Sequence, residues 1–95
     1  MKIPIVNKDD YIIWLEYFED AYWAHVNVFR WSANVKRSYV RDLDRVQNLI
    51  EDDLFGIAEA NNQKLIRFGQ MSGFHYLKAF TGTDQKDYKV FKRSL

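Results

Sequence analysis

The sequence predicts an α/β fold: a small mixed sheet with flanking helices, in the order β-α-β-α-β-α-β-β. Three patterns predict it: strand-like alternation of apolar residues, apolar residues at helical spacing, and turn residues between two apolar runs near the C-terminus. Strand–helix–strand connections imply parallel pairing in the middle of the sheet, and the C-terminal hairpin adds antiparallel strands. The chain has 95 residues, which is enough for a single domain over residues 1–95.

The N-terminal part is expected to hold a strand followed by a helix. Residues 2–6 form a short edge strand, because Pro4 cannot donate a hydrogen bond to a neighbouring strand. A helix is expected over residues 8–21, capped by Asn7 or Asp9. The apolar residues at helical spacing in this segment are Tyr11, Trp14, Leu15 and Phe18.

The next segment, residues 22–31, is expected to be a central strand. Its sequence, YWAHVNVFRW, places apolar groups on both alternating sets of side chains. The same residues could instead continue the preceding helix.

A second helix is expected over residues 33–50, capped by Ser32 or Asn34. One stripe of this helix is apolar and is predicted to be buried. The stripe consists of Val35, Tyr39, Leu43, Val46 and Ile50. A short buried strand follows over residues 54–60.

The C-terminal part is expected to hold a third helix and a hairpin. The helix covers residues 62–72, is capped by Asn61 or Asn62, and ends near Gly73. Strands over residues 74–81 and 87–93 form the hairpin, because TGTDQK between them has turn chemistry.

The composition excludes several classes of protein. Without cysteine, the chain has no disulfide, no thiolate nucleophile and no Cys-ligated zinc, and its two histidines lack the spacing of metal ligands. We therefore expect no metal site. No run of about 18 apolar residues predicts a membrane span, and the N-terminus has no secretory signal pattern. A cytoplasmic location is expected.

Charge is arranged in blocks, although the net charge is only +1. Acidic residues dominate 1–29 and 48–60, and basic residues dominate 30–47 and 61–95. The helix over 33–50 carries basic residues near two aromatics, as in some nucleic-acid-binding surfaces, but acidic residues interrupt the pattern. These residues are Arg30, Lys36, Arg37, Arg41 and Arg45, with Trp31 and Tyr39, interrupted by Asp42 and Asp44.

Residues 58–74, AEANNQKLIRFGQMSGF, together with the ending YKVFKR, resemble the C-terminal third of GNAT-type acetyltransferases. In that superfamily a strand ends at an Asn, a helix follows and closes at Gly-Phe, and a two-stranded ribbon comes last. With FRWSANVKR included, the chain resembles the small GNAT-related proteins of short-tailed phages. The resemblance covers residues 22–93 and implies the C-terminal half of the GNAT fold. It leaves the family's early strands and paired helices without counterparts, because little precedes residue 22.

The resemblance also implies a site for acetyl-CoA. Its pyrophosphate would lie at the start of the helix over 33–50, held by Arg30, Lys36 and Arg37, with Asn61 beside the pantetheine arm. The chain departs from the family pattern in two places. The segment RWSANVKR lacks the family's loop glycines, and Gly69 stands where many members have a Tyr that protonates the departing thiolate.

No catalytic residue is predicted. His25, on a strand face between Trp23 and Asn27, could act as a general base, but it is expected to be a partly buried histidine hydrogen-bonded within the sheet. His75 is expected to be a surface residue at the start of a strand. Asn61 has a second reading as a helix cap.

The favoured function is therefore a small, non-catalytic, phage-type protein on a reduced GNAT-like scaffold that binds a protein partner or further copies of itself. The expected contact residues are Trp14, Tyr17, Trp23 and Trp31, of which Trp14 and Trp23 could equally be core. The alternative is an acetyl-CoA-dependent N-acetyltransferase, completed by a dimer partner. A nucleic-acid-binding module is the least favoured reading. A phage-encoded chain would reside in the host cytoplasm or the virion.

Overall fold

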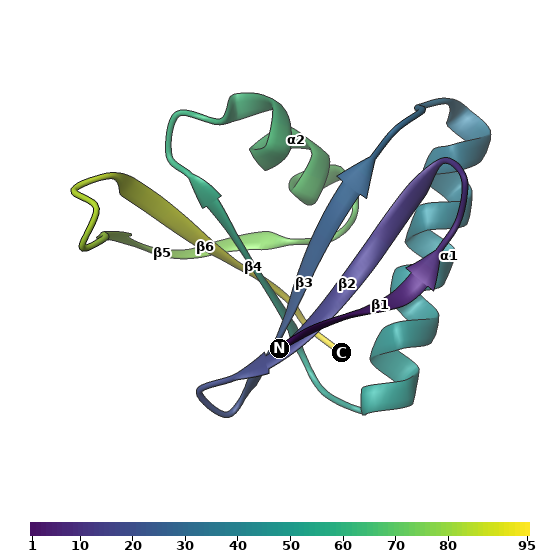
Figure 1. The fold of residues 1–95 in the computed structure, drawn as a ribbon, viewed down its shortest axis with the longest axis horizontal. Helices are drawn as coiled ribbons and strands as arrows, with labels where there is room; N and C mark the ends of the chain where they lie inside the picture. The colour runs from purple at the N-terminus through teal and green to yellow at the C-terminus, as the bar shows by residue number, and fades with distance from the viewer.

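Six strands form one mixed sheet, in the order β1-β2-β3-β4-β6-β5, in a computed structural model that describes residues 1–95 (Figure 1). The elements are β1 (Lys2–Asn7), β2 (Tyr11–Phe18), β3 (Ala21–Val28), α1 (Ala33–Ile50), β4 (Leu54–Glu59), α2 (Gln63–Met71), β5 (His75–Thr81) and β6 (Asp87–Arg93). The α/β class is confirmed. The order of elements is β-β-β-α-β-α-β-β, with two helices where three were expected.

The helix predicted over residues 8–21 is wrong, because this segment is strand β2 and the turn that follows it. Its side chains alternate between buried and half-buried, and Tyr11, Ile13 and Leu15 enter the core. Glu19 and Asp20 have φ of 50° and 59°, the left-handed backbone of a tight two-residue hairpin turn. A β-branched, aromatic segment packs well in a strand, and its two-residue period outweighs the helical spacing read from four of its residues.

Three antiparallel strands therefore precede α1. Strand β2 pairs with β1 on one side and with all eight residues of β3 on the other. The expectation that little precedes residue 22 was wrong. Strands β1 and β2 lie before that residue, and together with β3 the segment 2–28 supplies half of the strands.

The remaining elements lie where the sequence predicted them, within a few residues. Helix α1 begins after Ser32, whose Oγ accepts a hydrogen bond from Val35 N at 3.1 Å. Asn62 caps α2 in the same way, accepting from Leu65 N at 3.2 Å. Gly73 follows α2 with φ of 98°, as expected for a helix stop.

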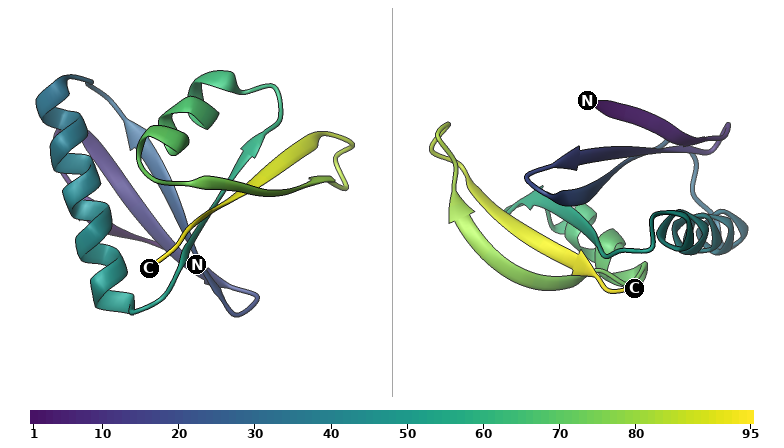
Figure 2. Two further views of the ribbon diagram at one scale, coloured as in Figure 1. Left: turned by 180° about the vertical axis from the view of Figure 1, so that it is seen from behind. Right: turned by 90° about the horizontal axis from the view of Figure 1, so that it is seen from below.

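Both helices cover the same face of the sheet (Figure 2). The predicted stripe of α1 faces this side: Tyr39, Leu43 and Val46 are buried, and Val35 and Ile50 pack at its margin. The opposite side of the sheet, here called the open face, carries no helix. Its apolar side chains come from β2, β3, β4 and β6 and are Ile12, Trp14, Trp23, Phe55, Ile57 and Val90.

Arg93 at the end of β6 ties this strand to both helices. Its Nε donates to Ser72 O just after α2 at 2.8 Å, and its guanidinium also reaches Asp44 Oδ1 at 2.6 Å and Gln47 Oε1, both on α1. Gln47 Nε2 in turn donates to Arg93 O at 2.8 Å. The side chain of Arg93 is almost covered, so its bonds to Ser72 and Gln47 are partly shielded from water, whereas Asp44 is 60% exposed and its bond is solvated.

A second polar cluster ties the β1–β2 hairpin to α1. Lys8 Nζ lies 2.6 Å from Asp42 Oδ2, and Tyr11 OH donates to the same carboxylate. Tyr11 OH and Ser38 Oγ are 2.7 Å apart. Burial by itself would raise the pKa of Asp42, but the hydrogen bonds from Lys8 and Tyr11 outweigh it and hold the pKa below its ordinary value.

Replacing Leu43 with Ala should lower the free energy of unfolding by about 2–5 kcal/mol, because Leu43 is fully buried and the change adds a cavity to the lost burial. Denaturant unfolding measures this. Leu49 lies on the solvent side of the same helix and is 72% exposed, so Leu49→Ala should change the free energy by no more than about 0.5 kcal/mol. Equal effects of the two changes would mean that α1 packs by another face.

Asp42 should make stability depend on pH. Because its pKa is lower in the folded chain than in the unfolded one, its contribution is complete above the unfolded pKa and is lost as pH falls through the folded pKa. The Asp42→Asn variant should therefore be less stable than the original chain near pH 7, with a smaller difference near pH 2.5. Urea unfolding at the two pH values measures this, and the exposed Asp9→Asn serves as control. A difference independent of pH would contradict the assignment.

Candidate functional site

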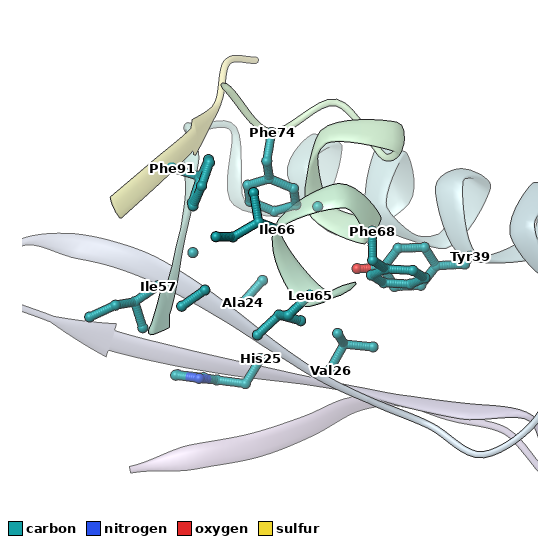
Figure 3. Close-up of a pocket in the computed structure, with 13 residues that line it drawn as sticks. Ala24, His25, Val26, Tyr39, Ile57, Leu65, Ile66, Phe68, Phe74 and Phe91 are labelled. Atoms are coloured by element: carbon teal, nitrogen blue, oxygen red, sulfur yellow. The ribbon is translucent and has the colours of Figure 1, made fainter. Parts of the chain in front are cut away.

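Strands β3 and β4 separate soon after they meet, and this leaves a gap in the middle of the sheet. They pair in parallel through only two residue pairs, Tyr22–Leu54 and Trp23–Phe55. The predicted parallel pairing is thus confirmed, but only at one end. Beyond it the strands diverge, and side chains of α2 enter from the helix side, Leu65 and Ile66 among them (Figure 3). A cavity of about 160 Å³ remains, lined mainly by apolar groups.

Only two titratable side chains line this cavity, His25 and Tyr39. His25 Nε2 lies 3.1 Å from Glu16 Oε1, a residue of the open face, and Figure 3 shows its ring directed away from the helices. Tyr39 packs on Phe68 with ring centroids 4.9 Å apart, and burial raises the pKa of its hydroxyl to about 12. The hydroxyl therefore stays protonated at neutral pH and cannot serve as a base.

Gly69 lies on the cavity-facing side of α2 and presents no functional group. A Cβ is sterically possible there, because it would meet only Phe74 Cβ, at 3.8 Å. The backbone therefore does not require glycine at this position.

A larger groove of about 950 Å³ opens between the β3–α1 loop and α2. Three cations line it, Arg30 from the loop and Lys64 and Arg67 from α2, and no acidic residue does. Its apolar lining includes Phe29 and Trp31, which are 60% and 45% exposed. The arrangement suits a ligand with a negative charge and an apolar portion. Lys64 and Arg67 were missed at the sequence level, although their spacing of three on a helix places them on one side.

The other residues predicted for a cofactor do not join Arg30. Lys36 and Arg37 line a neighbouring hollow on α1, of about 650 Å³, which also includes Asp44. Asn61 lines neither hollow and lies in the turn after β4, and its neighbour Asn62 caps α2.

The four aromatic residues predicted to contact a partner divide between two sides of the molecule. Trp14 and Trp23 lie on the open face, on adjacent strands. Tyr17 packs on Tyr22 at the far end of β2, with ring centroids 4.8 Å apart. Trp31 packs on Phe68 at the groove. Trp14 and Trp23 therefore belong to a common surface, and the other two do not.

Three further features bear on the sequence predictions. Tyr39, one of the two aromatics in the possible nucleic-acid pattern, is buried and cannot stack on a base. No group of three or more His, Asp or Glu side chains is placed to hold a metal ion. Neither helix has the length and apolar character that crossing a membrane requires.

Comparison with solved structures identifies the architecture. The chain superposes on a GNAT-family acetyltransferase from Bacillus anthracis with a TM-score of 0.71 and 10% identity, covering 88% of this chain and 57% of that one. A variant of spermidine N-acetyltransferase SpeG from Vibrio cholerae gives 0.65 and 8%, covering 90% and 66%. The NatC complex bound to Gag peptide and CoA gives 0.63 and 14%, covering 90% and 59%.

The chain therefore spans less than two thirds of the length of these acetyltransferases. No protein-family model matches it, and no curated protein matches it in sequence. What the superpositions establish is a partial GNAT fold, which extends over nearly all of this chain.

Replacing Gly69 with Ala should raise the free energy of unfolding by up to about 1 kcal/mol, because alanine favours a helix and space for its Cβ exists. The matched variant Gly73→Ala should be destabilising. Gly73 has positive φ, and a Cβ there would lie 3.1 Å from Arg93 Nε. Thermal or denaturant unfolding compares the two. A loss of stability in Gly69→Ala would mean that the gap cannot accept even a methyl group.

Proposed function

We propose that this protein is a non-catalytic binding protein on a partial GNAT scaffold, and that its ligand is a protein. The resemblance to small GNAT-related proteins of short-tailed phages is part of this proposal. One observation carries it: His25, the one residue lining the gap between β3 and β4 that could act as a general base, turns its ring away from the helices and pairs with Glu16.

The chemistry of the gap supports a binding role. Acetyl transfer to an amine needs a group that removes a proton from the amine and a group that protonates the leaving thiolate. His25 turns to the open face and pairs with Glu16, and Gly69 offers no hydroxyl. Tyr39 could donate a proton, but its hydroxyl is held under α2, where little of it is accessible.

The second candidate function is an acetyl-CoA-dependent N-acetyltransferase, and the groove beside α2 favours it. Arg30, Lys64 and Arg67 supply positive charge for phosphate groups, and Trp31 supplies an apolar wall. The sequence indicated four cofactor-binding residues. Of these, only Arg30 lines the groove where the phosphates of acetyl-CoA would lie, and Lys36, Arg37 and Asn61 lie outside it. The reacting end does not fit, because the gap lacks the proton-transfer groups.

An acetyl-transfer assay distinguishes the two functions, and thermal unfolding with and without acetyl-CoA shows whether the cofactor binds. A ligand at 100 times its Kd stabilises the folded state by about 2.7 kcal/mol, which raises Tm by several degrees in a domain of this size. We expect no acetyl transfer to amines at any acetyl-CoA concentration, and no such rise in Tm.

Measurable transfer by the purified protein would contradict the proposal. The acetyltransferase would then be the favoured function. In that case Arg67→Ala should abolish the rise in Tm caused by acetyl-CoA, and Arg45→Ala should not, because Arg45 lies outside the groove. A rise in Tm without transfer would retain the non-catalytic function and add an anionic ligand to it.

A further inference from the structure

The open face is an apolar part of the sheet that no helix of the chain covers. Trp23 and Phe55 pack together at its centre, with ring centroids 5.6 Å apart, on the two strands that meet in parallel. Trp14 lies diagonally across from Trp23 on the neighbouring strand. Ile57 is 36% exposed beside them. Val90, on the same side, is buried yet lies outside the core cluster, so a second apolar layer already begins here.

The molecule exposes more surface than its mass predicts. A compact monomer of 11.4 kDa has an accessible surface of about 5,800 Å², whereas this chain exposes 6397 Å². The excess, about 600 Å², approaches the roughly 800 Å² that each partner buries in a protein–protein interface of standard size. This excess belongs to the molecule as a whole, and an interface on the open face would bring the exposed area closer to that of a compact monomer.

Covering the open face would leave few polar groups unsatisfied. The indole nitrogens of both tryptophans are already bonded within the chain: Trp14 Nε1 donates to Asn27 Oδ1 at 2.7 Å and Trp23 Nε1 to Phe18 O at 3.1 Å. These rings can therefore lose water without losing a hydrogen bond.

The charges at the middle of this side are also paired within the chain, whereas Lys2 on the edge strand β1 and Lys78 on the edge strand β5 have no ionic partner. His25 lies against Glu16, and Lys92 lies 3.4 Å from Asp53. Glu59 has Lys86 at 3.5 Å. An identical surface brought against this one would therefore meet no unpaired charge of the same sign in β2, β3 or β4, which is the requirement for a two-fold symmetric contact.

We propose that the open face binds a second copy of this chain, so that two sheets pack face to face around Trp14, Trp23 and Phe55. This inference rests on the proposed binding function and names its partner. Two sheets packed in this way lie about 10 Å apart, with strands about 30° from alignment, and bury the side chains of both inner faces. The contact is isologous, so Ile57 of each copy faces the same surface of the other.

Sedimentation of the full chain from about 1 µM to about 300 µM tests the proposal by mass action. We expect a species of twice the 11.4 kDa chain mass to grow with concentration. Ile57→Arg should weaken the association about tenfold or more, because it sets two charges into the contact. The matched control is Leu49→Arg, which adds the same charge on the outer side of α1 and should leave the association unchanged.

Fluorescence gives a readout that needs no change on the open face. In a Trp31→Phe background the only indoles left are Trp14 and Trp23. Their emission should shift to shorter wavelength as concentration rises. This measurement decides the question if Ile57→Arg fails to fold.

A chain that stays monomeric at the highest concentration with unchanged emission would overturn the proposal, as would an Ile57→Arg dimer as tight as that of the original chain. Without acetyl transfer, the first result refutes the second copy as partner and the second result refutes the open face as the contact. Both leave the non-catalytic function in place. Acetyl transfer by monomer or dimer refutes the function and is measured separately.

Discussion

The structure depends on the way Arg93 joins parts of the chain that the sheet alone would leave loosely connected. Strands β3 and β4 share two residue pairs, so the half-sheet of β1, β2 and β3 and the half-sheet of β4, β6 and β5 meet along a short seam. Helix α1 packs on the first half, where Lys8 and Tyr11 bond to Asp42. Arg93, in the second half-sheet, bonds to Asp44 and Gln47 of the same helix and to Ser72 O at the end of α2. These bonds connect the two halves across the seam beside which the gap lies.

Much of the fold could be predicted from residue patterns. The exception is the helix expected over residues 8–21, which is strand β2 and the turn after it. Helix α1 has a stripe of five apolar residues with charged residues around it, a pattern that no strand would satisfy. The segment YIIWLEYF satisfies both periods, since Tyr11, Trp14, Leu15 and Phe18 fit a helix while Tyr11, Ile13 and Leu15 fit a strand. What decides is the partner: β3 offers eight residues to pair with, and Glu19–Asp20 can take the left-handed backbone of the turn. Pairing with a distant strand is not visible in a local pattern.

At the candidate site, some features follow from residue identity alone, and others depend on where the fold places the residue. The missing hydroxyl at Gly69 could be seen in the sequence. The direction of His25 could not, because it depends on which alternating set of β3 faces the helices. Lys64 and Arg67 gain importance only because α2 lies beside the β3–α1 loop, which brings them to Arg30. Trp31 was expected at a partner surface, and its packing against Phe68 makes it a wall of that groove.

The gap connects two surfaces with opposite character. From the helix side it is lined by Leu65 and Tyr39 and continues toward the basic groove, while His25 and Ile57 border it from the open face. A protein packed on the open face would close the gap from one side without touching Arg30, Lys64 or Arg67. The two surfaces can thus be occupied together, and a ligand in the groove would bind to a gap that the partner has already closed to water. Under the proposed function, the separation of β3 and β4 needs no proton-transfer group, because the opening would lie between two binding surfaces.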